Sequence, residues 1–211
     1  MSRGSFITLE GGEGTGKSSQ MPLLASALGA TGLEVVATRE PGGAPGAEEI
    51  RKLLVNGEVG RWDPLSELLL YVAARREHVV RTIEPALARG AWVLCDRFAD
   101  STIAYQGYGH GLGREACESA HRLALGSFAP DLTLILDLPV EIGLARAAGR
   151  AGAETRYERM DLAFHERLRA GFLEIARAAP GRCRVIDARG SLGEVQAALC
   201  RAIAERFALA L

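Results

Sequence analysis

The stretch FITLEGGEGTGKSSQ, residues 6–20, contains the pattern that decides the fold. A short apolar run leads into glycines at positions 11, 12, 14 and 16, and Lys17 and Ser18 follow. Residues 11–18 read G-x-x-x-x-G-K-S between a predicted strand and a predicted helix, the context that a phosphate-binding loop requires. Glu13 is the exception in this loop, because its carboxylate should repel a phosphate. We therefore expect Glu13 to face a different group.

Such a loop binds phosphate through successive backbone N–H groups and the positive end of the following helix. We expect Lys17 to reach the β- and γ-phosphates and the Ser18 hydroxyl to ligate Mg²⁺. The motif indicates a nucleoside triphosphate such as ATP but does not identify the reaction. The predicted nucleotide-binding residues of the loop are Gly11, Gly12, Glu13, Gly14, Thr15, Gly16, Lys17, Ser18 and Ser19.

Five short apolar runs alternate with helical patterns along the chain: SFITLE, LEVVATRE, AWVLCD, LTLILDL and CRVIDA. Continuous rather than alternating apolar runs indicate strands that are buried on both faces. We predict one α/β domain over residues 1–211 with the P-loop NTPase fold: a five-stranded parallel sheet and helices on both faces. The predicted helices span 18–28, 47–55, 64–88, 114–126, 140–148, 158–178 and 192–208, and Pro85 should disturb the last turn of the third.

Residues 147–161, AAGRAGAETRYERMD, form the least regular segment. They include few large apolar side chains, so we expect them to pack weakly and to form a short mobile lid. A solvated loop is the alternative. Three arginines, Arg150, Arg156 and Arg159, would allow a lid to close over an anion.

The bulk composition limits the class of protein. The chain has 211 residues, 48% of them hydrophobic and 24% charged, as in an ordinary globular protein. Its net charge of −1 argues against nucleic acid as a partner. We find no signal peptide and no apolar run near the ~20 residues that a membrane span needs. The four cysteines are far apart, which argues against a metal or redox pair and fits the reducing cytoplasm.

The run VLCDRF places Asp96 at the end of a predicted strand, beside the phosphate loop. An acid at this position commonly orients Mg²⁺ or its waters, and Arg97 would add an anion contact. A structural salt bridge is the alternative for both residues. The following residues include Ser101, Tyr105 and Gln106, whose polar and aromatic side chains suit a nucleobase or a sugar.

The run TREPGG brings two more charged residues, Arg39 and Glu40, to the same edge of the sheet. Pro41 and two glycines force a turn directly after the strand. Arg51 on the next predicted helix could face this cleft or could lie on a solvated helix face.

Tyr71 and Arg75 are four residues apart on one predicted helix, so they share a face. A ring and a guanidinium on one face suit stacking on a base and hydrogen bonding to it, whereas an ordinary core position is the alternative for Tyr71. The cations outnumber what one triphosphate needs, and phosphoryl transfer between two anionic substrates would explain them. They are Lys17, Arg51, Arg97, Arg150 and Arg156.

Over nearly its whole length the chain resembles the thymidylate kinases. The shared motifs occur in the family's order: TREPGG, EEIRKLL, LLLYVAARREHV, DRFADSTIAYQGYG, PDLTLILDL and RYERMDLAFHERLRAGF. The pattern DRxxDSxxAYQG is the most specific of them. The resemblance implies transfer of the γ-phosphoryl group of Mg-ATP to dTMP, in dTTP biosynthesis, by a homodimer whose long helices pack together.

The resemblance also implies roles on the acceptor side. Glu13 would accept the 3′-hydroxyl of the deoxyribose, and Tyr105 would exclude a 2′-hydroxyl. Tyr71 would stack on thymine, where the family usually has phenylalanine, and Arg75 would contact the base O4. Two residues would read the pyrimidine edge: Thr102 and Gln106. We predict three further acceptor contacts: Arg39, Pro41 and Ser101.

For the phosphates, the resemblance implies that Arg51 and Arg97 hold the acceptor phosphate and that Glu40 and Asp96 arrange the Mg²⁺ waters. The family carries its catalytic arginine either in the phosphate loop, directly after the acid, or in the lid. Gly14 occupies the loop position here. The implied catalytic set is therefore Lys17 and Arg97 with the lid residues Arg150 and Arg156, and Arg146 would lie near the adenine.

Other functions remain possible from the sequence. A kinase for another pyrimidine nucleotide, such as dUMP or UMP, is the nearest, although Glu13 and Tyr105 argue against a ribonucleotide. A GTPase-like switch would need an N-K-x-D stretch, which the sequence lacks. A protein that binds ATP without turnover is the third alternative. Two positions depart from the family pattern: His110 and Thr155.

Overall fold

The computed structural model describes residues 3–149 and 156–211. Within these residues lies a five-stranded sheet with the strand order β2-β3-β1-β4-β5, and all four pairings are parallel. The strands are β1 (Phe6–Glu10), β2 (Val35–Arg39), β3 (Trp92–Asp96), β4 (Leu132–Asp137) and β5 (Cys183–Asp187). The predicted parallel α/β sheet is confirmed.

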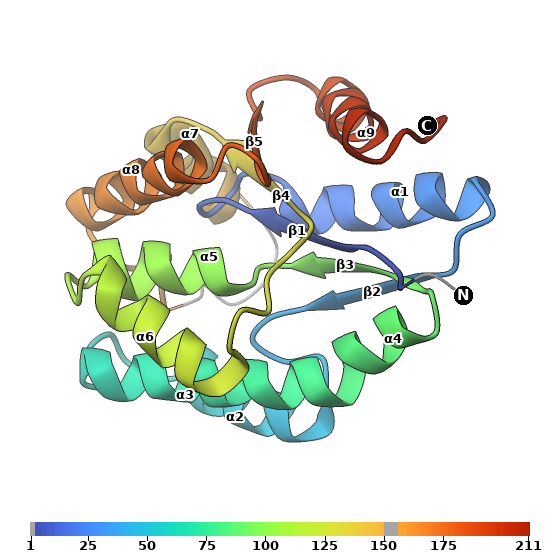
Figure 1. The fold of residues 1–211 in the computed structure, drawn as a ribbon. Helices are drawn as coiled ribbons and strands as arrows, with labels where there is room; N and C mark the ends of the chain where they lie inside the picture. Colours follow the sequence, from blue (N-terminus) through green and yellow to red (C-terminus); the bar gives the residue numbers. More distant parts are fainter. Residues whose placement is uncertain (1–2, 150–155) are drawn as a thin grey trace.

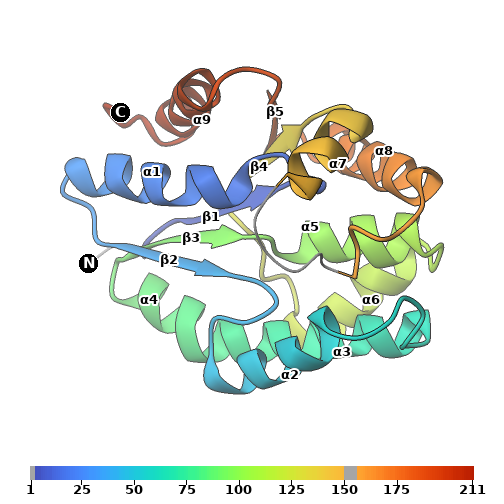
Figure 2. The same ribbon diagram turned by 180° about the vertical axis from the view of Figure 1, so that it is seen from behind.

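Helices cover both faces of this sheet (Figures 1 and 2): α1 and α9 lie on one face, and α3, α4 and α6 lie on the other. The described helices are α1 (Lys17–Ala30), α2 (Pro45–Val55), α3 (Pro64–His78), α4 (Glu84–Ala88), α5 (Ala99–Thr102), α6 (Arg114–Leu125), α7 (Val140–Ala148), α8 (Leu162–Ala178) and α9 (Leu192–Phe207). Two π-helical segments complete them: η1 (Val79–Ile83) and η2 (Ile103–Gly109).

Burial on both faces explains why the strands are continuous apolar runs. Ile7 and Leu9 of β1 belong to the core that includes Leu24 of α1 and Leu199 of α9. Phe6 belongs to a second core on the opposite face, with residues of η1 and α4. Successive side chains of a strand point to opposite faces, so the apolar positions of a central strand meet an apolar layer on either face. Thr8 is an exception in β1, because its hydroxyl pairs with that of Thr133 in β4 at 3.0 Å.

Three helical regions differ from the prediction. The expected helix 64–88 changes to π geometry at η1, and Pro85 lies in the first turn of α4, where a missing N–H is tolerated. The expected helix 158–178 begins only at Leu162, because the Asp161 side chain accepts from the Phe164 N–H at 2.7 Å and caps α8. Residues 99–109, for which we predicted no helix, form α5 and η2.

The carboxyl ends of β1, β2 and β3 lie side by side, because these strands are neighbours in a parallel sheet. Ligands of such sheets bind outside this edge, where the connecting loops converge. The phosphate loop, the TREPGG run and the DRF run follow these three strands, whereas the predicted lid follows β4 and α7. Among the described residues no helix is long and apolar enough to cross a membrane.

Candidate active site

The predicted phosphate loop connects β1 to α1, as the motif requires. Gly11, Gly14 and Gly16 have positive φ angles of 133°, 67° and 94°. Gly14 is constrained a second way, because a Cβ there would collide with the carbonyl oxygen of Gly143 in α7. No side chain among the described residues caps α1 at Gly16, so its first N–H groups are available to a ligand. The loop therefore has the backbone of an anion site.

Lys17 is buried and folds back over this loop. Its Nζ donates to the carbonyl oxygens of Gly11 (2.9 Å) and Gly12 (2.8 Å) and to Thr15 Oγ1 (3.2 Å). Burial, reinforced by repulsion from Arg97, lowers the pKa of Lys17 to about 8. The ammonium thus stays largely charged at neutral pH, and its neutral partners are ones that a phosphate oxygen could replace. Ser18 and Ser19 of the first turn of α1 are exposed.

Asp96 ends β3 and lies in register with Arg39 of β2. Its Oδ1 is buried and has no hydrogen-bond partner among the described residues, as would suit an oxygen that meets a cation. Residues 3–149 and 156–211 contain no group of three or more histidine, cysteine or acidic side chains that could hold a metal. Mg²⁺ takes most of its ligands from water and phosphates, so Asp96 together with the Ser18 hydroxyl fits this ion.

Glu40 is placed differently from what we expected. Its Oε2 accepts from Arg75 Nε at 2.7 Å and its Oε1 lies 3.1 Å from His78 Nδ1, and all three side chains are buried. Arg75 Nη2 also donates to Thr102 Oγ1 at 2.7 Å and to the carbonyl oxygen of Phe98 at 3.1 Å. These contacts favour a role for Glu40 in orienting Arg75 over one in arranging Mg²⁺ waters. Arg75 also lines the cavity described below.

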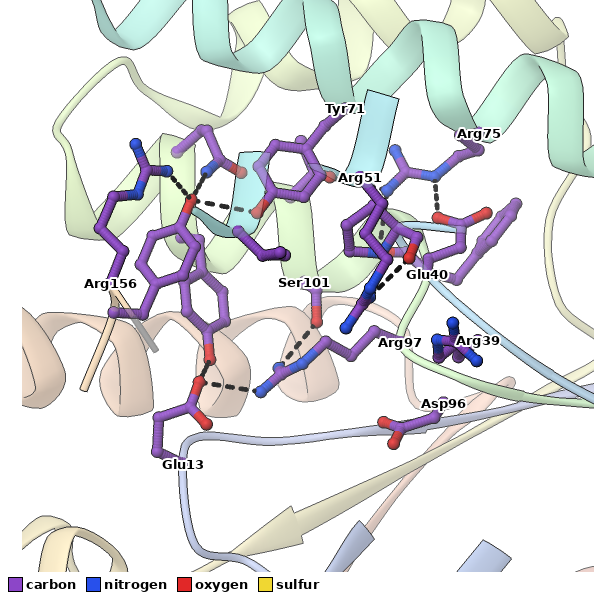
Figure 3. A pocket seen from close by; sticks show the side chains of 17 residues that line it. Glu13, Arg39, Glu40, Arg51, Tyr71, Arg75, Asp96, Arg97, Ser101 and Arg156 are labelled. Atoms are coloured by element: carbon purple, nitrogen blue, oxygen red, sulfur yellow. Dashed lines mark hydrogen bonds and ion pairs between the residues drawn. The ribbon is translucent and has the colours of Figure 1, made fainter. Parts of the chain in front are cut away.

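Arg97 links the phosphate loop to the next cavity. Its φ of 71° is unusual for a residue with a side chain. Nη1 donates to the Gly11 carbonyl oxygen (2.9 Å) and to Ser101 Oγ (3.2 Å), and Nη2 donates to Glu13 Oε1 (3.1 Å). The same Glu13 oxygen accepts from the Tyr105 hydroxyl at 2.6 Å (Figure 3). Glu13 therefore points out of the loop toward Arg97 and Tyr105.

Glu10, which we did not predict as a functional residue, binds two of the residues that follow Arg97. It is fully buried at the end of β1, and it accepts from the Phe98 N–H at 2.7 Å and from the Ser101 hydroxyl at 2.5 Å. Burial, with added repulsion from Asp100, raises the pKa of Glu10 to about 8. The sequence held one signal, an acid that ends an apolar run immediately before the loop.

A cavity of about 170 Å³ lies beside Arg97 (Figure 3). All the residues predicted for the acceptor line it: Glu13, Arg39, Glu40, Pro41, Arg51, Tyr71, Arg75, Arg97, Ser101, Thr102, Tyr105 and Gln106. Asp96, Phe98, Arg156 and Tyr157 line it as well. The cavity thus brings together arginines, three tyrosines and the acidic side chain of the phosphate loop.

A buried polar cluster of Glu67, Gln106, Arg156 and Tyr157 borders this cavity, and its last three members line it. Arg156 forms a close ion pair with Glu67, and the Tyr157 hydroxyl donates to Glu67 Oε1 at 2.7 Å. Gln106 Nε2 donates to the same oxygen at 2.8 Å. Burial would raise the pKa of Glu67, but the nearby His110 ring, the hydrogen bond from Tyr157 and the charge of Arg156 lower it to about 2. Glu67 and Tyr157 were missed, although Glu67 lies four residues before Tyr71 on the same helix face.

The remaining predicted cations are spread more widely. Arg51 Nη1 donates to the Pro41 carbonyl oxygen at 2.6 Å, at the cavity wall. Arg146 lies outside the cavity lining, and its Nη1 donates to the carbonyl oxygen of Ala188 at 3.0 Å. Arg150 lies outside the described residues.

Comparison with known proteins agrees with the geometry. The family model described as "Thymidylate kinase" matches residues 9–199. A thymidylate kinase of Caulobacter vibrioides is 57% identical over 209 residues, which cover 99% of this chain and 100% of that one. Another, of Rhizorhabdus wittichii, is 51% identical over 203 residues, covering 96% and 98%. The crystal structure of thymidylate kinase from Ehrlichia chaffeensis superposes with a TM-score of 0.78 at 37% identity and covers 95% of this chain and 99% of that one. The chain belongs to the thymidylate kinase family.

Proposed function

We propose that the protein transfers the γ-phosphoryl group of Mg-ATP to dTMP, giving dTDP and ADP, in dTTP biosynthesis. The observation that carries this proposal is the junction at Glu13 and Arg97. Glu13 belongs to the phosphate loop, yet its carboxylate accepts from Arg97 and Tyr105, which line the neighbouring cavity. Two anion sites that share one wall suit two phosphorylated substrates meeting end to end.

On the donor side, residues 11–19 would bind the ATP phosphates, with Lys17 on the β- and γ-phosphates. Arg146 would lie near the adenine. Ser18 and Asp96 would hold Mg²⁺, partly through water, and the ion would neutralise charge on the phosphate oxygens. The unpaired Asp96 Oδ1 supports this assignment.

On the acceptor side, Arg97 and Arg51 would hold the phosphate of dTMP, and Glu13 would accept the 3′-hydroxyl. Tyr105 lies against Glu13, which supports its role in excluding a 2′-hydroxyl. Tyr71 would stack on thymine. The edge of the base would meet Arg75, Thr102 and Gln106, and the wall would be completed by Arg39, Glu40, Pro41 and Ser101.

The chemistry needs no strong general base, because the dTMP phosphate is already ionised near neutral pH. Catalysis would come from alignment of the attacking oxygen and from neutralising charge as it develops. Lys17 and Arg97, which both belong to the described residues, would supply part of the positive charge that neutralises the transferring phosphoryl group. A lid arginine would supply more, and such arginines contribute about 10³–10⁵ in rate.

We propose that the lid covers about residues 147–161 of a single domain and that Arg150 or Arg156 is the catalytic arginine. Gly14 supports a lid origin, because the loop itself offers no arginine there. Arg156 is paired with Glu67, so it would have to leave that carboxylate to reach a transferring phosphoryl group. We also propose that the protein forms a homodimer, which the family resemblance implies. We propose a cytoplasmic location, which the widely spaced cysteines favour.

The test is a coupled assay of ADP release with Mg-ATP and one acceptor at a time: dTMP, dUMP, UMP, dCMP or dGMP. A Lys17→Met variant and a reaction without acceptor serve as controls for contaminating activity. Strong preference for dTMP is the expected result. Equal or better turnover of dUMP would favour the alternative pyrimidine kinase, and release without acceptor dependence would indicate an NTPase.

A further inference from the structure

The side-chain amide of Gln106 has a fixed orientation. Gln106 belongs to η2, is only 1% exposed and lines the cavity. Its Nε2 donates to Glu67 Oε1 at 2.8 Å and to the Tyr157 hydroxyl at 3.0 Å. An amide NH₂ group has two hydrogens, so both are taken up by the hydrogen bonds to Glu67 and Tyr157. The amide atom that remains for a ligand in the cavity is the carbonyl Oε1.

Glu67 is the residue that prevents the amide from turning over. Its carboxylate is 2% exposed and is ringed by the charged or titratable groups Arg156, Tyr157 and His110, whose Nε2 lies 3.5 Å from Glu67 Oε1. With a pKa of about 2 it is ionised and can only accept hydrogen bonds. A flipped Gln106 would set its carbonyl oxygen against this carboxylate and leave a buried acceptor unpaired.

This orientation defines what the cavity demands of a base. A buried carbonyl oxygen needs a donor opposite it, and an acceptor there is rejected because both groups stay unpaired. Thymine and uracil carry an N–H at ring position 3. Cytosine carries an unprotonated nitrogen at the same position.

We propose that Glu67 is a positioning residue for base selection, holding the Gln106 amide so that its carbonyl oxygen accepts the ring N3–H of a thymine-type base and rejects cytosine. The inference rests on the proposed function, since it assigns a selector to the base pocket of that reaction. A merely structural Glu67, present only to pair with Arg156, would not affect the choice between bases.

The first experiment compares wild type with Glu67→Gln, which keeps the shape but no longer imposes an acceptor on Gln106. We expect the ratio of kcat/KM for dCMP to that for dTMP to rise about tenfold or more, as one mismatched hydrogen bond is removed. The ratio for dUMP to dTMP should stay unchanged, because both bases carry N3–H. An unchanged dCMP ratio, or an equal shift of both ratios, overturns the proposal.

Two matched variants separate selection from general disturbance. Glu77→Gln makes the same substitution on the same helix, at a partly exposed ion pair with Arg81 outside the cavity, and should preserve both ratios. Tyr157→Phe removes several hydrogen bonds of the cluster but leaves the Glu67 carboxylate opposite the amide. It should therefore retain discrimination against dCMP, and loss of that discrimination would assign the selection to Tyr157 instead.

The second measurement uses wild type alone, so it does not depend on a variant that folds. Cytosine N3 takes up a proton in mildly acidic solution and becomes a donor, whereas Glu67 stays ionised. We measure the affinities for dCMP and dUMP by calorimetry at neutral and at mildly acidic pH. The affinity for dCMP relative to dUMP should rise by up to about tenfold for each unit by which the pH falls. The dUMP reference cancels the titration of the shared phosphate. A flat ratio overturns the inference, and because binding is measured, this result is independent of whether dTMP is turned over.

Discussion

Arg97 offers the sharpest test of the site, because its side chain and its backbone make separable predictions. We compare Arg97→Ala with Arg97→Gly. Both remove the guanidinium, which reaches Gly11, Ser101 and Glu13. Only glycine also relieves the backbone, which has a φ of 71°.

The magnitudes follow from burial and conformation. The side chains of the Arg97–Glu13 pair are 18% and 13% exposed. Removing one partner of a largely buried pair should lower the free energy of unfolding by about 3 kcal/mol. A positive φ costs a non-glycine residue roughly 1 kcal/mol, so the glycine variant should be more stable than the alanine variant by about that amount. In a strand or helix interior the order would be the reverse.

Urea unfolding measures the stability difference, and steady-state ADP release measures activity. Both variants should lose at least about 100-fold in kcat/KM for dTMP, the equivalent of about 3 kcal/mol of phosphate binding. Arg89→Ala, which breaks an exposed pair with Glu34, is the control and should behave as wild type. A glycine variant less stable than the alanine variant would refute the backbone argument. An unchanged KM for dTMP in both would refute the phosphate assignment.

Three further predictions address other parts of the site. Arg156→Ala should lower kcat by about 10³ or more and change the KM for dTMP less, and a KM effect alone would contradict a catalytic role. The pKa of Glu10 is raised in the folded protein to about 8, against an ordinary 4.5, so the unfolded chain releases this proton at a lower pH than the folded protein does. Wild type should therefore lose stability relative to Glu10→Gln as the pH rises from about 5 to about 8, and parallel urea midpoints would argue against a buried, protonated Glu10. Gly14→Ala should destabilise the fold by about 2 kcal/mol or more through its positive φ and its collision with Gly143, whereas Gly12→Ala, which meets open space, should not; equal melting temperatures would contradict this packing.

Much of the fold could be predicted because the strands are apolar on both faces. The predicted run LTLILDL contains β4 (Leu132–Asp137) and is longer than it by one residue at its end. The stretch that became α5 and η2 could not be predicted, because it contains two glycines, Gly107 and Gly109, and no helical periodicity. Its packing against α8 decides its conformation: a Cβ at Gly109 would collide with Phe164. Such tertiary contacts override local propensity.

The candidate site, like the fold, could be predicted from the sequence only in part. The predicted acceptor residues line one cavity, because their motifs follow neighbouring parallel strands and the helices after them. Glu10 and Glu67 were missed, because the sequence alone does not show whether the side chain of a glutamate is buried. Their partners, Ser101 for Glu10 and Gln106 for Glu67, lie far away in the sequence. The contact of Glu40 with His78 was hidden for the same reason.

The backbone contact between Gly14 and Gly143 has a consequence for how this enzyme could evolve. An arginine at position 14 would occupy the space of the Gly143 carbonyl group, and its backbone would carry an unfavourable φ. A single codon change at position 14 therefore cannot place an arginine in the phosphate loop while α7 stays where it is. A chain with an arginine at this loop position would need a coordinated shift of the loop and of α7, so position 14 is constrained to glycine by a helix more than 100 residues away in the sequence.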